Sequence, residues 1–225
     1  MTTTTRTSSL HLLIGLFVTT LIVSNIIATK VGVFFGYFLP VAVLLFPISY
    51  IIGDVLTEVY GYAVTRRVTW IGFFCNAVAT LAIYLGGLIS PAPFFGGEVA
   101  YHTILDATVR MFIASLTAYT VGEFANAFIL AKLKVRMAGK HLWVRTISST
   151  IIGEGLDSAV FITIAFYGMM PTPALLAMLV TQWLFKVGFE VLATPITYLV
   201  VGILKKREQV DYYDRDTNFN PLTIH

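Results

Sequence analysis

Six long apolar stretches limit what this chain can fold into. A helix needs about 20 mostly apolar residues to cross the roughly 30 Å hydrocarbon core of a membrane, and each stretch has that length. The stretches cover residues 10–29, 39–63, 68–89, 107–131, 146–167 and 174–203. The composition agrees, because 57% of residues are hydrophobic, 12% are charged and the mean hydropathy is +0.82. The sequence therefore predicts an all-α, polytopic membrane protein with six transmembrane helices.

The six stretches also divide the chain. Residues 1–9 are predicted to be a disordered N-terminus, 10–207 a six-helix transmembrane domain and 208–225 a polar cytoplasmic tail that is partly ordered at most. The first stretch follows the N-terminus without a small-residue cleavage site, so no removable signal peptide is expected.

The positions of the basic residues predict the orientation. Cytoplasmic loops of membrane proteins carry an excess of Lys and Arg. Twelve of the 15 basic residues lie in the N-terminus, the second and fourth loops or the tail: Arg6, Arg66, Arg67, Lys132, Lys134, Arg136, Lys140, Arg145, Lys205, Lys206, Arg207 and Arg215. The opposite side keeps only Lys30 and Arg110. Both termini are therefore expected in the cytoplasm, with Arg66 and Arg67 marking where the second span reaches water.

The basic residues and the single cysteine argue against a nucleic-acid partner and against a disulfide or cysteine metal site. The sequence pI is near 9.0, but the basic residues cluster beside apolar stretches, where they set orientation, so a nucleic-acid partner is not expected. Cys75 is the only cysteine and lies in an apolar stretch, which excludes a disulfide within one chain and a cysteine metal site.

Polar side chains form a stripe on four of the predicted helices. Residues spaced three or four apart share one face of a helix. The stripes are Asp54 and Glu58; Tyr119, Glu123 and Asn126; Glu154, Asp157 and Phe161; and Gln182, Lys186 and Glu190, with Trp183 beside the last. Most of these residues are predicted to lie within one or two turns of the membrane midplane.

These stripes contain six embedded acids and one embedded base, Lys186. At most one acid can be matched to that lysine. An ionised side chain in lipid costs roughly 2.5–3.5 kcal/mol, so the other acids must be protonated, hydrated in a cavity, or paired with neighbouring helices and a ligand. Six unrelated structural hydrogen bonds are the competing explanation. A shared polar cavity accounts better for acids on four helices.

The third loop, residues 90–108, combines Pro91, Pro93, Gly96 and Gly97 with aromatic residues, so it is not expected to be one regular helix. Two interpretations stay open, namely a solvent-exposed connector and a lid over an outward-facing site.

An enzyme is the rival functional class. The histidines His11, His102, His141 and His225 all lie at or outside span ends, so they cannot build an intramembrane metal site. HExxH, GxSxG and glycine-rich phosphate-loop motifs are absent from the sequence. The clustered acids with Gln182 and Trp183 favour a shaped pocket over a through-pore. Neither an enzyme nor a cofactor is therefore expected.

Four motifs, in order along the chain, carry a family resemblance. The segments DVLTEVYGYAVTRR, SSTIIGEGLDSAVF, QWLFKVGFEV and RDTNFNP resemble the queuosine precursor transporters, also classed as a vitamin-uptake transporter family. The resemblance covers about residues 25–221. It implies a multi-pass inner-membrane protein that imports 7-deazaguanine precursors of the tRNA base queuosine, namely 7-cyano- or 7-aminomethyl-7-deazaguanine. It also implies an architecture similar to substrate-binding components of energy-coupling-factor transporters.

That implied ligand can be compared with the polar stripes. A deazaguanine offers two adjacent N–H donors, a carbonyl acceptor and a flat π-face, which a carboxylate, an amide and an aromatic ring can bind. The candidates for these roles and for the surrounding site are Glu58, Glu123, Asn126, Glu154, Asp157, Gln182, Trp183, Lys186 and Glu190. Trp183 or Phe161 would stack on the base, and Lys186 is expected to pair with Asp157 or Glu190.

Two transport hypotheses remain open. The protein either carries the base inward alone, or serves as a binding component that needs a partner ATPase. The absence of an obvious docking motif of small residues in the first span favours the first. A purine-like small molecule and the lipid bilayer are the expected partners, and homo-oligomerisation is left open.

Overall fold

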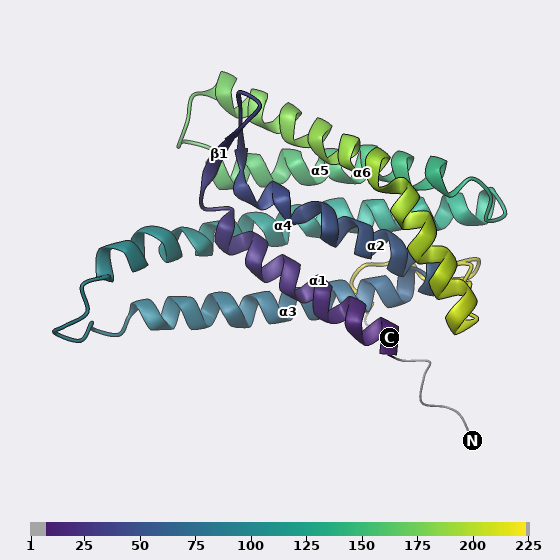
Figure 1. Ribbon diagram of the computed structural model, residues 1–225, viewed down its shortest axis with the longest axis horizontal. Helices are drawn as coiled ribbons and strands as arrows, with labels where there is room; N and C mark the ends of the chain where they lie inside the picture. Colours follow the sequence, from purple (N-terminus) through teal and green to yellow (C-terminus); the bar gives the residue numbers. More distant parts are fainter. Residues whose placement is uncertain (1–7, 224–225) are drawn as a thin grey trace.

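A computed structural model describes residues 8–223 as a bundle of six α-helices with one short β-hairpin. The helices are α1 (Ser8–Ile27), α2 (Phe46–Tyr60), α3 (Tyr62–Gly87), α4 (Glu98–Arg136), α5 (Leu142–Phe166) and α6 (Thr172–Glu208). They run along the longest axis of the molecule, and the start of α1 and the end of α6 lie at the same end (Figure 1). The chain is thus an all-α polytopic membrane protein, as the sequence predicts.

Five helices are long and apolar enough to cross a membrane, and within residues 8–223 these are α1, α3, α4, α5 and α6. The prediction of one continuous span over 39–63 is wrong. That stretch contains the end of strand β2 (Tyr37–Pro40), a 3-10 turn (Val41–Leu44) and then α2, whose 15 residues reach only about 22 Å. Pro40 and Pro47 explain the late start, because proline cannot donate a hydrogen bond inside a helix.

Gly61 separates α2 from α3. Its φ of 86° lies in the left-handed region that glycine adopts without strain, so the chain ends one helix and begins the next within a single residue. The ring of Tyr212 packs where a side chain on Gly61 would stand. The two helices therefore meet at a junction that a larger residue could not form.

The hairpin precedes α2. Strand β1 (Val31–Phe34) pairs antiparallel with β2, and the turn between them uses Phe35 and Gly36 at positive φ. Gly36 takes a φ of 87° in this turn, which glycine adopts without strain. In Figure 1 the hairpin lies at the end of the bundle opposite to the start of α1.

Helix α4 is longer than expected and shortens the third loop. The predicted span of 107–131 extends to 39 residues, because 98–106 and 132–136 are also helical. Residues 90–108 are not one regular helix, as expected, because the segment before Glu98 is irregular and the rest belongs to α4. A glycine pair, Gly96 and Gly97, precedes the first turn, and His102 bonds Glu98 and Asp106, each four residues away on the same face.

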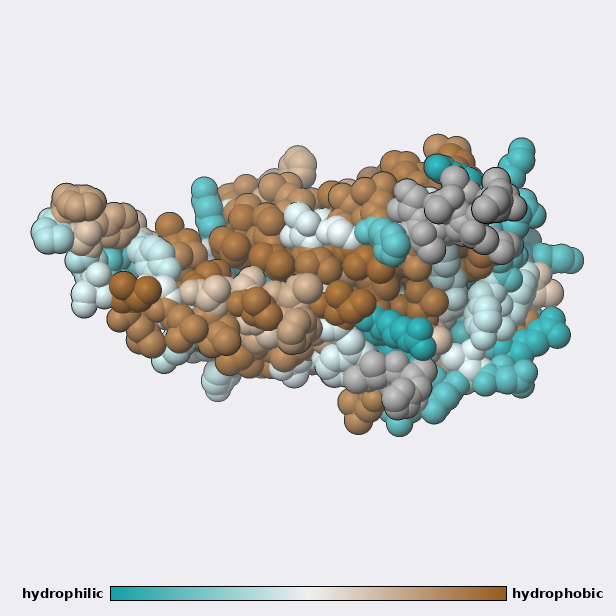
Figure 2. Space-filling view, turned by 90° about the horizontal axis from the view of Figure 1, so that it is seen from below, coloured by the Kyte–Doolittle hydropathy of each residue, from teal (hydrophilic) through white to brown (hydrophobic). Residues whose placement is uncertain are grey.

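The surface is divided along the long axis. Figure 2 shows hydrophobic residues over most of the length and hydrophilic residues gathered at the end where α1 starts and α6 ends. Exposed basic residues at the loops and helix ends there include Arg67, Lys132, Arg136, Lys140, Lys206 and Arg207. An apolar belt with polar ends is the surface of a protein that crosses a lipid bilayer.

The segment after α6 packs against the helices, so the prediction of a tail that is partly ordered at most is wrong for residues 209–223. Asp214 is buried and accepts hydrogen bonds from the backbone N–H of Tyr62. Arg66 is 2% exposed and donates to the backbone carbonyls of Asn218 and Asn220. Arg66 therefore holds the C-terminal segment, and only its neighbour Arg67 reaches water as expected. The predicted disordered N-terminus falls mostly outside the described residues.

Candidate functional site

The polar stripes of four helices meet inside the bundle. α2, α4, α5 and α6 each turn one polar face inward, as the spacing of three and four residues predicts. Among the predicted site residues, the following are buried: Glu58, Glu123, Asn126, Glu154, Asp157, Gln182, Lys186 and Glu190. Asp54, which shares a stripe with Glu58, is buried as well. The structure divides them into an inner cluster around Lys186 and Asp54, and a second cluster around Glu58.

Lys186 is the centre of the inner cluster. Its ammonium donates to Asp157 and, at 3.0 Å, to Glu154, and it lies 4.7 Å from the ring centre of Tyr50. Tyr50 also donates from its hydroxyl to Asp157 over 3.4 Å. The predicted pairing of Lys186 with Asp157 is confirmed. The expectation that the lysine can match only one acid is wrong, because two carboxylates share it.

Asp54 and Asn126 form a second contact of this cluster. The amide of Asn126 donates to Asp54 over 2.7 Å, which joins α2 to α4. One oxygen of Asp54 and the amide oxygen of Asn126 are buried without a hydrogen-bond partner in residues 8–223. The same is true of both amide atoms of Gln182 and one oxygen of Glu190. The Glu123 carboxylate lies beside the buried hydroxyl of Tyr119, one turn back on α4, which can fill one of its acceptor positions and leaves the others open. The inner cluster thus contains polar atoms that the fold itself does not satisfy.

Glycines let the helices that carry this cluster approach closely. A Cβ on Gly122 of α4 would lie 2.8 Å from the backbone oxygen of Gly153 on α5, and a Cβ on Gly153 would lie 2.8 Å from that of Gly122. On α2, the Glu123 carboxylate occupies the space where a side chain on Gly53 would stand. These contacts fix Glu123 between α2 and α5.

Glu58 belongs to the second cluster. It pairs with Arg145 at the start of α5 and with Lys205 near the end of α6 at 2.6 Å, and it lies 3.7 Å from Lys134 of α4. The prediction of a single embedded base missed these three cations, since Lys134 and Arg145 are as buried as Lys186. The sequence places Lys134, Arg145 and Lys205 in loops or in the tail, and no pattern of spacing distinguishes them from exposed basic residues there.

The C-terminal segment completes this second cluster. Asp211 contacts Lys134 at 2.6 Å and Lys205 at 2.9 Å, and the backbone oxygen of Tyr212 accepts from Lys134. Burial alone would raise the pKa of Asp211, but the two ammonium groups outweigh it and hold that pKa below its ordinary value. The second cluster therefore joins α2, α4, α5, α6 and the C-terminal segment at the basic end of the molecule.

The two aromatic candidates lie differently. The indole N–H of Trp183 donates to the backbone oxygen of Ile151 over 3.0 Å, and its ring packs beside Gly155, so this contact holds α6 against α5. Phe161 is buried and meets Phe46 edge to face at 5.8 Å. Phe46 itself lies under Lys186, with the ammonium 5.5 Å from its ring centre. Phe161 is therefore nearer to the inner cluster than Trp183.

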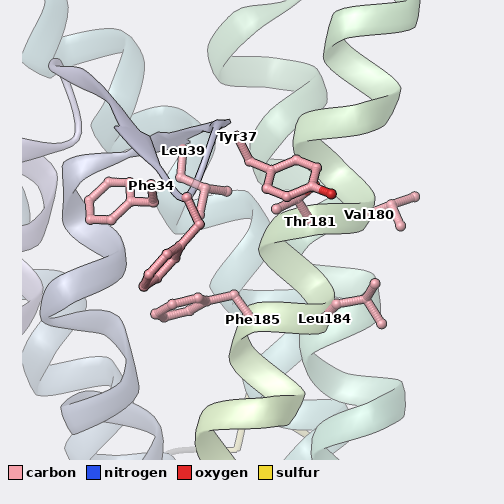
Figure 3. A pocket seen from close by; sticks show the side chains of 8 residues that line it. Phe34, Tyr37, Leu39, Val180, Thr181, Leu184 and Phe185 are labelled. Atoms are coloured by element: carbon pink, nitrogen blue, oxygen red, sulfur yellow. The ribbon is translucent and has the colours of Figure 1, made fainter.

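A large cavity lies elsewhere, between the hairpin and α6. Its volume is about 510 Å³, and Figure 3 shows its lining side chains. These are Phe34, Phe35, Tyr37, Leu39, Val180, Thr181, Leu184 and Phe185. The lining is almost wholly apolar and contains none of the predicted site residues. Because a ligand is oriented by placed polar groups, the inner cluster is the better candidate for recognition despite the size of this cavity.

Metal binding has no support in the described part of the chain, where no group of three or more His, Cys, Asp or Glu side chains has the geometry to hold an ion.

Comparison with known proteins places these features in a family. Residues 40–200 match the family described as "Putative vitamin uptake transporter". The chain is 26% identical over 159 residues to the "Probable queuosine precursor transporter" of Bacillus subtilis (strain 168), which covers 69% of each chain. It is 30% identical over 124 residues to the protein of that name from Haemophilus influenzae, covering 55% of this chain and 50% of the relative. No solved structure matches.

Proposed function

This chain belongs to the family described as "Putative vitamin uptake transporter", and on that premise we propose that it imports 7-deazaguanine precursors of queuosine across the inner membrane. The family name implies a transporter and not an enzyme. The proposed substrates are 7-cyano- and 7-aminomethyl-7-deazaguanine, in keeping with the printed names of the two relatives.

One structural observation supports this proposal most strongly. Buried polar side chains from four helices meet inside a bundle whose outside is apolar. Each embedded charge costs roughly 2.5–3.5 kcal/mol on insertion scales, so a cluster of them is retained for function or is paired. Lys186 contacts two of the acids, whereas Glu123 is in no salt bridge among the residues described and has only the hydroxyl of Tyr119 beside it as a donor. A polar ligand bound at this depth would satisfy the remaining groups.

The orientation forms part of the proposal. We infer six membrane crossings, with α2 and the hairpin together forming the second, and both ends of the chain in the cytoplasm. The exposed basic residues at one end of the bundle and the position of the start of α1 and the end of α6 support this arrangement. The second cluster, around Glu58, would then lie on the cytoplasmic side of the inner cluster and close the path inward.

The alternative is a binding component of an energy-coupling-factor type importer, which needs a partner ATPase. Both hypotheses use the same ligand site, so they differ in energy coupling alone.

Uptake by purified protein in liposomes tests the proposal. We expect the protein to accumulate labelled 7-cyano- or 7-aminomethyl-7-deazaguanine without ATP or any other protein, with protein-free liposomes as the control. Binding of the base without uptake would favour the ATPase-dependent alternative. Absence of both binding and uptake for either precursor would overturn the proposed substrate class.

A further inference from the structure

Two side chains of the inner cluster, those of Glu123 and Gln182, have buried polar atoms that can accept or donate further hydrogen bonds. Glu123 is 2% exposed and Gln182 is 1% exposed. In the described part of the chain the polar atoms of Gln182 have no hydrogen-bond partner, and the Glu123 carboxylate has the hydroxyl of Tyr119, one turn away on α4, as a neighbour that can donate one hydrogen bond to it. Burying a donor or acceptor without a partner costs roughly 1–3 kcal/mol, so a fold does not retain several of them without a reason. These side chains leave buried donor and acceptor positions that a polar ligand can fill.

The lysine end of the same cluster is different. Lys186 is contacted by Glu154 and Asp157 and lies over the ring of Tyr50. Its charge is matched by two carboxylates, so it needs no ligand to compensate it. Glu154 and Asp157 also anchor α5 to α6 through this ammonium. The part of the cluster around Lys186 therefore holds α5 and α6 together, and the part around Glu123 and Gln182 is the one available to a ligand.

We propose that Glu123 is the residue that recognises the pairing edge of a guanine-type base, with Gln182 serving its carbonyl, and that Lys186 is a positioning residue. This inference rests on the proposed function and identifies how the same site selects its substrate class.

The chemistry fits because both carboxyl oxygens of Glu123 are acceptors. A guanine-type edge presents two adjacent N–H donors, which one carboxylate accepts side by side. An adenine-type edge places an acceptor beside a donor, so a carboxylate would face one repulsive contact. The amide of Gln182 has a free N–H₂ group that can donate to the carbonyl of the base. Glu123 therefore favours guanine-type over adenine-type bases through attraction and repulsion together.

Two neighbours place the Glu123 carboxylate. Gly53 on α2 leaves the space that the carboxylate fills, and Tyr119, one turn back along α4, can donate its hydroxyl to the carboxylate. A methyl group on Gly53 would displace the carboxylate and leave its charge unchanged. Gly53→Ala is thus a second way to disturb recognition without altering an ionisable group.

Competition binding to the purified protein tests the assignment. The probes are 7-deazaguanine and 7-deazahypoxanthine, which lacks the exocyclic amine and so offers one donor fewer. Wild type should bind 7-deazaguanine roughly tenfold or more tightly, as loss of a hydrogen bond to a charged group predicts. In Glu123→Gln, whose amide cannot accept both donors, the ratio should fall to within about threefold. Asp106→Asn removes one charge from an exposed site on the same helix and should keep the wild-type ratio.

The outcomes separate the inference from the proposed function. A Glu123→Gln protein that keeps the wild-type ratio overturns the role of Glu123, while binding by wild type leaves the proposed substrate class standing. Failure of wild type to bind either probe overturns both. If Glu123→Gln does not fold, Gly53→Ala replaces it, with Gly188→Ala as the control because a methyl group there meets no atom within 4 Å. Retention of the full ratio in Gly53→Ala would then count against the assignment.

Discussion

Lys186 and Glu154 lie on neighbouring helices with the ammonium 3.0 Å from the carboxylate, and the same ammonium also contacts Asp157. One buried cation is therefore shared between two acids, and both carboxylates depend on it to compensate their negative charge. Removing the cation strands two carboxylates in the membrane interior, whereas removing one acid strands none.

The Lys186 cluster predicts a graded rescue. Lys186→Ala should lower stability by about 3–5 kcal/mol, the typical cost of breaking a buried ion pair from one side. Adding Asp157→Asn should recover part of this loss, and adding Glu154→Gln should recover more, because each change removes a stranded charge. Thermal melts of these three detergent-purified variants, together with Asp157→Asn and Glu154→Gln alone, measure the series. Simple additivity of the single changes would show that the residues are not coupled.

Orientation predicts which loops can be labelled from outside. In a Cys75→Ser background, an impermeant thiol reagent added to intact cells should modify Gly96→Cys in the third loop and leave Lys140→Cys unmodified. Both positions are exposed in the structure, so access is decided by the side of the membrane. The reversed pattern would contradict cytoplasmic termini.

The crossing of α4 and α5 predicts sensitivity to a single methyl group. Gly122→Ala should destabilise the protein by about 1–3 kcal/mol and reduce uptake, because its Cβ would meet the backbone of α5 and push apart helices that carry Glu123 and Asp157. Gly188→Ala is the matched control, since the space there is open. That change should leave stability equal or slightly higher, as alanine favours helices. Equal melting temperatures for both variants would count against a tight crossing.

Asp211 predicts a loss of stability in acid. Its pKa is lower in the folded protein than in the unfolded chain, so the unfolded chain binds the proton more readily. The stabilisation is complete well above the ordinary value of 3.8 and is lost as the pH falls through the lower, folded pKa. The melting temperature of wild type should exceed that of Asp211→Asn at neutral pH, and the difference should shrink below about pH 4. A difference that does not change with pH would exclude this ionisation as the cause.

Arg66 and Arg67 predict opposite responses to the same substitution. Arg66→Ala removes donors to two carbonyls of the C-terminal segment, so protease should cleave residues 209–223 faster in membranes opened at the cytoplasmic side. Arg67 is exposed, and Arg67→Ala should leave cleavage at the wild-type rate. The time course of the cleaved fragment on a gel measures both. Equal rates for the two variants would show that Arg66 does not retain the segment.

The inward-facing residues could be predicted from the sequence because they follow from helical period and hydropathy alone. Asp54, Glu123 and Asp157 are buried as expected, since an acid in an apolar helix must avoid lipid and the spacing shows which face it shares. The partition of these acids into paired and unpaired groups could not be predicted, because it depends on how four helices are rotated about their axes.

The cations around Glu58 were missed for a related reason. A count of Lys and Arg by loop gives the side of the membrane on which they lie and says nothing of the direction in which each side chain points. Lys134 and Arg145 therefore looked like Lys132 and Lys140, yet the first two are buried and the others are exposed. The break in the second span at Gly61 was hidden likewise, since an apolar run does not reveal where its backbone changes direction.

The C-terminal segment has a consequence for folding kinetics. It reaches Tyr62 and Trp70 through hydrogen bonds between residues 151 to 157 positions apart in the chain. Contacts of such large sequence separation pay the entropy of closing a long loop, so they form late, after the intervening helices have packed. Substitutions at this surface should therefore speed unfolding and leave the folding rate almost unchanged. Docking of the C-terminal segment is therefore expected to be the last step in the assembly of the bundle.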